Sequence, residues 1–412
     1  MKTDGELVVT VTWGNEQPEL VVIDPNDGQP AVLGRLALPQ HSPRGLVLDG
    51  DRALVLSDGY SEDFPTPLPE RGAHVLPIRA GRSQVIVEQI DLSDPTAPNS
   101  VGSLTVDGSL VDTRMVDGVA RVVVTAAPSG LEFTYPTDGR PEAEQEATDA
   151  NRAIIESSTL EQWLPGYELT TGGDEPETGA LVPCERMNHP ATFAGLETLT
   201  VLTLPLAAPL TTGNPVSVLA SGATVYGTAD GLYVAMTDWR FRIMPMGAEI
   251  GDTDGSRSDA AEPEAPEQTT QIHQFGFDGQ GRAEYLASGA VPGWLLNQYA
   301  LSEHEGVLRV ATTRDAFRGT REGTSESGIV TLRRDGDQLA PIGEVGGLGQ
   351  GEQIYAVRFM GSVGYVVTFR QTDPLYTVDL SDPTNLRVVG ELKIPGYSAY
   401  LHPVGDGLLL GV

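Results

Sequence analysis

The amino-acid sequence predicts an all-β fold of the propeller type, built mostly from four-stranded blades, and three observations carry this prediction. Apolar stretches of strand length recur along the chain, separated by turns rich in Gly, Pro and Asp, with 48 glycines and 30 prolines in 412 residues. Asp-Gly dipeptides, which suit tight hairpin turns, mark many of these turns. The pattern also repeats with a period of about 40 to 50 residues, which a β-sandwich does not explain.

The repeat is clearest in two stretches that share an Asp-Leu-Ser-Asp-Pro turn. They read EQIDLSDPTAPNSVGSLTV at 88–106 and TDPLYTVDLSDPTNLRVVGELKIPG at 372–396. Looser copies lie at 19–38, 198–220, 271–289 and 328–346. Two further short strands around a Gly turn follow each copy, so the unit has four strands. The sequence therefore predicts a single propeller domain over 1–412 with about six blades, alone or with an incomplete seventh.

The two ends of the chain leave two arrangements open. The last unit stops at Gly411-Val412 after two strands. In the first arrangement the ring closes because residues 397–404 join the N-terminal strands 6–13, 19–24 and 31–38. In the second, the chain is truncated at both ends and the last blade is incomplete.

The aspartates of the shared turn recur at equivalent positions, as Asp91 and Asp94 in one copy and Asp379 and Asp382 in the other. Carboxylates that recur at each turn of a repeat are expected to accept hydrogen bonds from turn amides, and this interpretation is preferred to a metal or acid–base site.

Two segments interrupt the repeat. Residues 141–163 are rich in helix formers and predict an inserted helix with an apolar stripe of Ala153, Ile154, Leu160 and Trp163. Residues 247–268 are acidic and contain almost nothing to bury, so they predict a disordered loop.

The composition excludes several classes of function. A formal charge of -31 opposes binding to nucleic acid or anionic lipid. No apolar run is long enough for a transmembrane helix, and the start of the sequence has no signal-peptide pattern. A solvated acidic surface explains the charge best; carboxylates that hold divalent cations, as in a calcium-stabilised surface protein, are the alternative.

Motifs for catalysis or cofactor binding are incomplete. Ser398 lacks the second glycine of a nucleophile elbow, and the glycine-rich stretch 347–351 has no following helix or nearby lysine. Cys184 and His189 have no second pair to complete a metal site. We therefore predict no catalytic residue, no metal ligand and no cofactor.

A candidate binding site emerges when the Gly turns are aligned, because the innermost strands of a propeller line its channel. Polar and cationic residues recur there, and the predicted set is Arg44, Asp112, Arg114, Ser302, Arg358, Tyr400 and His402. Arginines that converge in so acidic a chain would attract a small anionic ligand or an acidic protein or peptide segment. The alternative is that these residues form structural ion pairs that close the channel, for example Arg114 with a neighbouring Asp112.

The sequence also resembles a known family. KTDGELVV near the start, ASGAVPGWLLNQYALSEHEGVLRVATT at 287–313 and the block at 365–403 resemble uncharacterised secreted proteins of bacteria and archaea with a C-terminal β-propeller domain. The stretches 181–204 and 163–165 are similar to actinobacterial members. The resemblance implies an extracellular or cell-envelope location, a parent with seven or eight blades of which this chain is a fragment, and no established activity.

These observations favour a non-enzymatic, extracytoplasmic binding or interaction module. The rival hypothesis is a hydrolase or lyase at the mouth of the channel, using His402, His304 and acidic partners. A histidine within hydrogen-bonding reach of a carboxylate would favour the enzyme.

Overall fold

The computed structural model describes most of the chain, in two compact units. The described residues are 1–14, 17–39, 42–61, 82–131, 133–136, 140–173, 175–238, 268–314, 325–369, 373–394, 398–405 and 407–412. Unit 1 consists of Met1–Leu131, Ser158–Gly222 and Gly276–Tyr285. Unit 2 consists of Glu132–Ser157, Ala223–Phe275 and Leu286–Val412.

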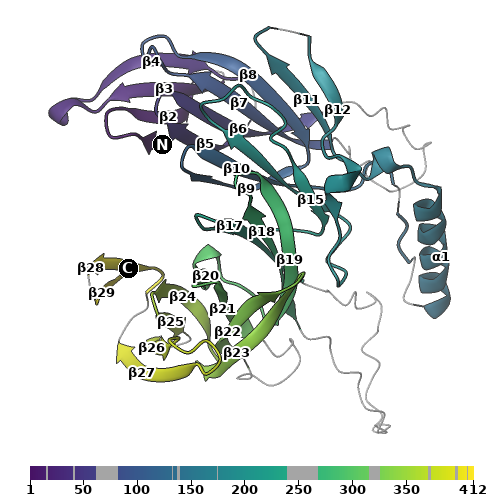
Figure 1. The fold of residues 1–412 in the computed structure, drawn as a ribbon, viewed down its shortest axis with the longest axis vertical. Coiled ribbons are helices and arrows are strands. Elements are labelled where there is room, and N and C mark those ends of the chain that lie inside the picture. The colour runs from purple at the N-terminus through teal and green to yellow at the C-terminus, as the bar shows by residue number, and fades with distance from the viewer. Residues whose placement is uncertain are drawn as a thin grey trace, which may run out of the picture. The chain divides into compact units, whose positions relative to one another are not determined.

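Unit 1 contains three sheets, each based on a meander of antiparallel strands (Figure 1). Blade 1 is formed by β1 (Lys2–Thr3), β2 (Val8–Trp13), β3 (Pro18–Asp24) and β4 (Ala31–Ala37). Blade 2 is formed by β5 (Ser42–Asp49), β6 (Arg52–Ser61), β7 (Arg82–Asp91), β8 (Asn99–Asp107), β11 (Gly166–Thr171) and β12 (Glu177–Ala180). Blade 3 is formed by β9 (Ser109–Val116), β10 (Val119–Ala126), β14 (Thr198–Pro205), β15 (Val216–Leu219) and the parallel edge strand β13 (Met187–Asn188).

Unit 2 continues the same pattern. Blade 4 has β16 (Thr224–Gly227), β17 (Gly231–Asp238), β18 (Thr269–Phe277) and β19 (Ala283–Pro292), and the turn between its last two strands belongs to unit 1. Blade 5 has β20 (Leu301–His304), β21 (Val307–Arg314), β22 (Glu326–Asp335) and β23 (Gln338–Leu348), which a short parallel contact joins to blade 4. Blade 6 has β24 (Gln353–Met360), β25 (Val363–Phe369), β26 (Asp373–Asp379) and β27 (Arg387–Ile394). A hairpin of β28 (Leu401–Gly405) and β29 (Leu408–Gly411) follows.

The predicted fold class is confirmed, because five sheets of four or more strands and a two-stranded hairpin follow one another along the described chain, and the eight-stranded sheet combines blades 4 and 5. Both arrangements expected for the ends stay predictions, since the N-terminal strands and residues 397–404 belong to different units and each is described within its own. β28 pairs with β29, whereas β2 pairs with β1 and β3.

The inserted helix exists, but it is shorter than expected and turns a different face inward. α1 spans Pro141–Ser157 and is followed by the short 3-10 helix η2 (Leu160–Gln162). The predicted stripe of Ala153, Ile154, Leu160 and Trp163 is wrong, since Ala153 and Leu160 are exposed and the buried residues are Ala143 and Ala147. Helical spacing instead continues from the buried alanines to the half-buried Asn151 and Ile154. The acidic segment expected at 247–268 lies, up to residue 267, outside the described residues.

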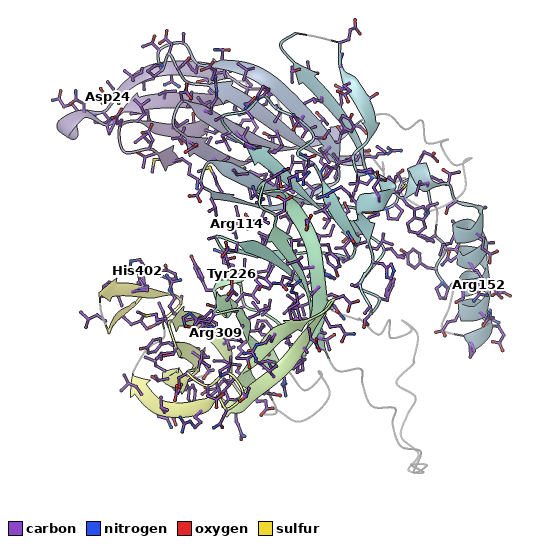
Figure 2. The ribbon with its side chains drawn as sticks, viewed as in Figure 1. Asp24, Arg114, Arg152, Tyr226, Arg309 and His402 are labelled. Atoms are coloured by element: carbon purple, nitrogen blue, oxygen red, sulfur yellow. The ribbon has the colours of Figure 1, made fainter. Side chains whose placement is uncertain are left out.

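The repeated aspartates cap turns, as the sequence predicted. Oδ1 of Asp91 and of Asp379 accepts a hydrogen bond from the amide two residues later, at 2.9 and 3.0 Å. Asp94 and Asp382 do the same to a threonine amide, each at 2.9 Å. Asp24, at the β3–β4 turn, accepts from the Asn26 amide (Figure 2). Hydrogen bonds from the Thr96 side chain and amide lower the pKa of the Asp94 carboxyl, and those from the Thr384 amide and side chain lower that of Asp382. The Ser381 side chain and amide, and then Arg387, lower the pKa of Asp379.

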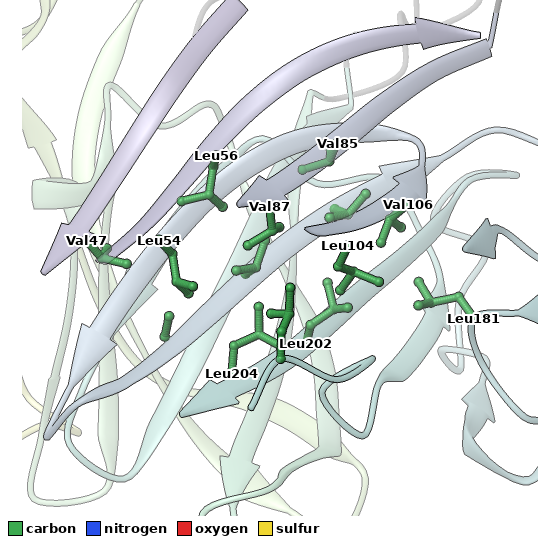
Figure 3. Close-up of a cluster of buried hydrophobic side chains, with 14 of the residues drawn as sticks. Val47, Leu54, Leu56, Val85, Val87, Leu104, Val106, Leu181, Leu202 and Leu204 are labelled. Atoms are coloured by element: carbon green, nitrogen blue, oxygen red, sulfur yellow. The ribbon is translucent and has the colours of Figure 1, made fainter. Parts of the chain in front are cut away.

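Apolar cores fill the spaces between successive blades within each unit. Between blades 2 and 3, alternate strand residues such as Leu56, Val87, Leu104 and Leu202 interdigitate and are fully buried (Figure 3). In unit 2, one core joins blades 4 and 5, and a second joins blades 5 and 6. Successive side chains of a strand point to opposite faces of the sheet, so each sheet can offer apolar residues to the blades on both sides.

A glycine in the fourth strand of several blades receives the turn of the following blade. We call Gly34, Gly102, Gly289 and Gly343 the docking glycines. A Cβ on Gly34 or Gly343 would lie less than 3.0 Å from a backbone oxygen of that turn, one on Gly289 would lie as close to the Leu339 oxygen just after it, and one on Gly102 would lie 3.3 Å from the Leu210 Cβ. Absence of a side chain is thus what allows neighbouring blades to approach at these points.

Candidate functional site

The predicted site residues lie on, or directly beside, the first strand of their blades. Unit 1 holds Arg44 on β5 with Asp112 and Arg114 on β9. Unit 2 holds Ser302 on β20, Arg358 on β24 and His402 on β28, with Tyr400 just before β28. Convergence of all seven residues around one channel stays a prediction.

The residues of unit 1 form ion pairs with one another or with their neighbours. Asp112 Oδ1 and Arg114 Nη1 are 2.6 Å apart on the same strand, and the guanidinium also donates to the Thr113 carbonyl oxygen at 3.0 Å. Arg44 Nε lies 3.5 Å from Asp58 Oδ2 on the adjacent strand. These contacts are ion pairs of the kind that the alternative hypothesis expected. Arg114, however, pairs with Asp112 of its own strand.

The residues of unit 2 include a cluster of different character, which we call the Arg358 cluster: Tyr299, Arg358, Tyr400 and His402. The Arg358 guanidinium carbon lies 5.1 Å from the ring centroid of Tyr299 and 5.8 Å from that of Tyr400. The two tyrosine rings are themselves 5.5 Å apart and inclined at 58°. This geometry is a cation–π arrangement in which a half-buried cation faces two aromatic rings.

His402 completes the cluster at its exposed side. Its Nδ1 lies 3.3 Å from the Tyr400 hydroxyl oxygen, and the two ring centroids are 5.9 Å apart. Within the described residues, Arg358 has neither an ion pair nor a hydrogen bond, so its cationic charge is balanced only by the tyrosine rings.

Local structure explains how these side chains are brought together. Tyr299 lies in the 3-10 helix η4 (Gln298–Ala300), whose N-cap residue Asn297 accepts a hydrogen bond from the Tyr299 amide at 2.9 Å. Ala300 and Leu401 are buried core residues, and they anchor the segments that carry Tyr299, Tyr400 and His402. Because strand side chains alternate, burial of Leu401 turns its two neighbours to the opposite face.

Ser302 belongs to a second polar group, centred on the buried Arg309. Arg309 is 5% exposed and donates hydrogen bonds to the Ser302 hydroxyl at 2.6 Å and to the Gly361 carbonyl oxygen in the β24–β25 turn. Its guanidinium also lies 5.0 Å from the Phe359 ring centroid. Nearby, Tyr226 accepts a hydrogen bond from the Glu303 amide (Figure 2). Arg309 thus links blade 5 to blade 6.

Arg121 occupies the equivalent third position of β10 in unit 1 and has equivalent contacts. It donates to the Gly281 carbonyl oxygen at 2.6 Å and lies 4.1 Å from the Phe277 ring centroid. Burial lowers the pKa of both Arg121 and Arg309. The recurrence indicates a structural role for these arginines rather than a ligand-binding one.

We predict that Arg309→Met lowers the free energy of unfolding by about 2 kcal/mol, because the Gly361 carbonyl and the Ser302 hydroxyl lose a charged donor while the apolar volume is retained. Chemical denaturation measures the change. Arg333→Met on the exposed face of β22 is the control and should change stability by less than about 0.5 kcal/mol. Equal effects of the two substitutions would contradict this role of Arg309.

Two residues of this region were missed by sequence reasoning. Tyr299 escaped because the alignment assumed strand alternation back from Ser302, which passes over position 299, whereas η4 turns Tyr299 toward Arg358. Arg309 escaped because only first strands were searched. Its signal was nevertheless present, as an arginine at the same place in VARVVV and VLRVAT after a Gly turn.

The two histidines of the enzyme hypothesis, His304 and His402, have no carboxylate partner in the described part of the chain. There, no group of three or more His, Cys, Asp or Glu residues could hold a metal ion. No helix of the described segments has the length and apolarity needed to cross a bilayer.

Meandering blades that pack face to face define this molecule as an all-β propeller protein. The chain belongs to the family described as the β-propeller domain, whose profile matches residues 1–412.

Two archaeal proteins are similar to part of the chain. One is an uncharacterized protein of Methanocaldococcus jannaschii, 50% identical over 127 residues, which are 31% of this chain and 20% of that protein. The other, from Archaeoglobus fulgidus, is 47% identical over 142 residues, or 34% of this chain and 21% of that protein. The match thus spans about a fifth of each relative. Among solved structures, an uncharacterized protein from Listeria monocytogenes EGD-e aligns over 98% of this chain and 85% of that chain, with 8% identity and a TM-score of 0.31.

Proposed function

We propose that this propeller is a binding module that captures the carboxylate groups of a small anion or an acidic peptide at the Arg358 cluster. The observation that carries the proposal is the set of contacts that the Arg358 guanidinium group makes. Its guanidinium group lies beside two tyrosine rings, yet it has no carboxylate or hydrogen-bond partner among the described residues.

Such an arginine differs from the others on the first strands. Arg44 and Arg114 already have carboxylate partners, so an incoming anion would have to compete with Asp58 or Asp112. Arg358 keeps its N–H donors available for a planar, bidentate carboxylate, and hydrogen bonds between two charged groups are the strong ones. In a chain of formal charge -31, a cation without a carboxylate partner offers a rare attractive point for an anion.

The neighbouring side chains suit a ligand that is more than a point charge. The tyrosine rings offer apolar surface beside the cation, and the Tyr400 hydroxyl and His402 ring offer polar contacts at the exposed side. This combination matches general features of small-ligand sites, in which aromatic walls carry a few directed polar groups. Arg44 and Arg114 are already paired with carboxylates and Ser302 with Arg309, so the proposal does not include them.

The rival proposal, a hydrolase or lyase, has less support from the geometry. It needs a histidine oriented by a carboxylate, whereas the described partner of His402 is the Tyr400 hydroxyl. Turnover of a chromogenic ester or an acidic polysaccharide that is lost in His402→Ala would establish the enzyme and overturn the binding module.

We predict that citrate and an acetylated pentaglutamate peptide bind the chain in calorimetric titrations at low salt, and that Arg358→Gln weakens binding roughly tenfold to a hundredfold. The two probes separate the sources, because binding of citrate alone indicates a small ligand and binding of the peptide alone indicates a protein segment. Raising the salt concentration should weaken both interactions.

Arg114→Gln is the matched control. It removes one positive charge from a first strand, but from an arginine that Asp112 already pairs. Affinity in this variant should stay within about twofold of the original. Equal loss in both variants would indicate a general charge effect, and absence of binding by either probe would refute the proposal.

We further propose that the module acts outside the cytoplasm, which the resemblance to secreted proteins supports. Antibody labelling of intact cells of the source organism tests this location. Labelling that appears only after lysis would contradict it.

A further inference from the structure

The fourth strand of blade 6 carries a glycine like the docking glycines of the earlier blades, but no other described segment of unit 2 docks on it. Gly390 on β27 corresponds to Gly34, Gly102, Gly289 and Gly343. A Cβ on Gly390 would meet only Thr377 of its own sheet, at 3.5 Å, which is ordinary van der Waals contact. The four docking glycines instead meet the turn of the next blade or the residue just after it.

Apolar residues around Gly390 are correspondingly exposed. Val389 is 60% exposed and Leu392 is 55% exposed. The residues at the same two positions around the docking glycines are buried or half-buried in every case: Leu33 and Leu36, Val101 and Leu104, Ser288 and Val291, Ile342 and Val345. These two positions of the repeat are covered in the blades with docking glycines, whereas on β27 they are exposed.

In two of the earlier blades, a polar side chain opposite the docking glycine donates a hydrogen bond to the docked turn or connection. In blade 5, Thr331 pairs with Gly343 across the strands and donates its hydroxyl to the Pro383 carbonyl oxygen of the docked turn at 2.6 Å. In blade 2, Gln89 pairs with Gly102 and donates to two carbonyl oxygens of the docked connection. Thr377 pairs with Gly390 in the same way, and its hydroxyl has no hydrogen bond among the described residues.

The hairpin after blade 6 presents an open edge as well. β29 pairs only with β28 among the described strands, and its Leu408 and Leu410 are 61% and 51% exposed. The second strands of blades 2 and 3 are paired on both sides, and their Leu54 and Val122 are at most 1% exposed. An unpaired apolar edge is a template for strand addition.

We propose that Gly390, Thr377, Val389 and Leu392 form a docking surface for a β-hairpin of the repeat's own kind. One strand of the hairpin extends the sheet at β29, and its Asp-Pro turn lies on Gly390. Thr377 donates its hydroxyl to a carbonyl oxygen of that turn, as Thr331 does to Pro383. The occupant is thus recognised by backbone geometry and by a proline-containing turn, without need of an ionic contact.

The test extends the chain after Val412 with a copy of residues 370–394, which contains a third strand, the Asp-Pro turn and a fourth strand. Reactivity of an introduced thiol at Val389→Cys reports coverage, and the exposed Cys184 serves as reference in the same molecule. We expect the extension to slow labelling at position 389 roughly tenfold relative to Cys184. Thr377→Val in the host strand should reverse part of that protection, and Gly390→Val should abolish it.

The matched control is an extension in which residues 380–386 of the copy are replaced by Asn-Gly, so that the strands remain and the docking turn is lost. Equal protection by both extensions, or none by either, would overturn the proposal. Protection of the unextended chain that increases with its concentration would assign the surface to a second copy instead. If the extended chain does not fold, the peptide 370–394 is added in trans, and unchanged thiol reactivity at its highest soluble concentration refutes the docking.

Discussion

Replacement of Gly343 by alanine is expected to lower the free energy of unfolding by about 3 kcal/mol, at the upper end of what overpacking usually costs. The new Cβ would collide with the Pro383 carbonyl oxygen and the Thr384 Cα. Both are backbone atoms of the β26–β27 turn, so no side-chain rotation relieves the clash. Relief requires that blade 6 move away from blade 5, which would also disturb the Thr331–Pro383 hydrogen bond.

Gly390→Ala is the matched control, because Gly390 holds the same place in a blade whose docking partner is absent from the described structure. Its Cβ has room, and alanine lowers the chain entropy of the unfolded state, so stability should stay within about 1 kcal/mol or increase. Urea denaturation of the two variants measures the difference. A loss as large for Gly390 as for Gly343 would show that the cost arises within the strand and not between blades.

This contrast shows what a repeated sequence does and does not convey about packing. Recurrence of the Asp-Pro turn and the Val-Gly-x-Leu strand predicted the blades, because turn residues and strand alternation act locally. The sequence does not indicate what each glycine meets. Gly343 and Gly390 stand in similar strands, and only the structure shows that one is covered by a turn and the other is open.

The sequence predicted only part of the candidate site, because local patterns place residues on strands but do not show which strands become neighbours. The positions of Arg358 and His402 on their strands followed from the alignment of the Gly turns, because that alignment depends only on the local sequence pattern. The partners of each arginine depend on which strands become neighbours, and the tyrosine contacts of Arg358 required the 3-10 turn at Tyr299. Likewise, the inward face of α1 follows Ala143 and Ala147, since small residues allow close packing where bulkier apolar residues were expected.

Acidification is expected to destabilise unit 2 through His273, a fully buried residue of β18. Burial lowers the pKa of His273 from 6.5 to about 4, because the charged ring would lose its hydration. The unfolded chain therefore takes up the proton first as the pH falls. The stability that the neutral ring contributes is complete above pH 6.5 and is lost progressively between pH 6.5 and about 4, up to roughly 3 kcal/mol.

His273→Leu should remove most of this pH dependence while it keeps an apolar group of similar size in the core, and unfolding curves across the window measure the slope. His304→Gln changes an exposed histidine and should leave the slope unaltered. Asp94, Asp379 and Asp382 affect mainly the acid end of this window, because their lowered pKa values place most of their loss of stability below pH 3.8. A slope that persists in His273→Leu would mean that His273 binds its proton in the folded chain as readily as in the unfolded one.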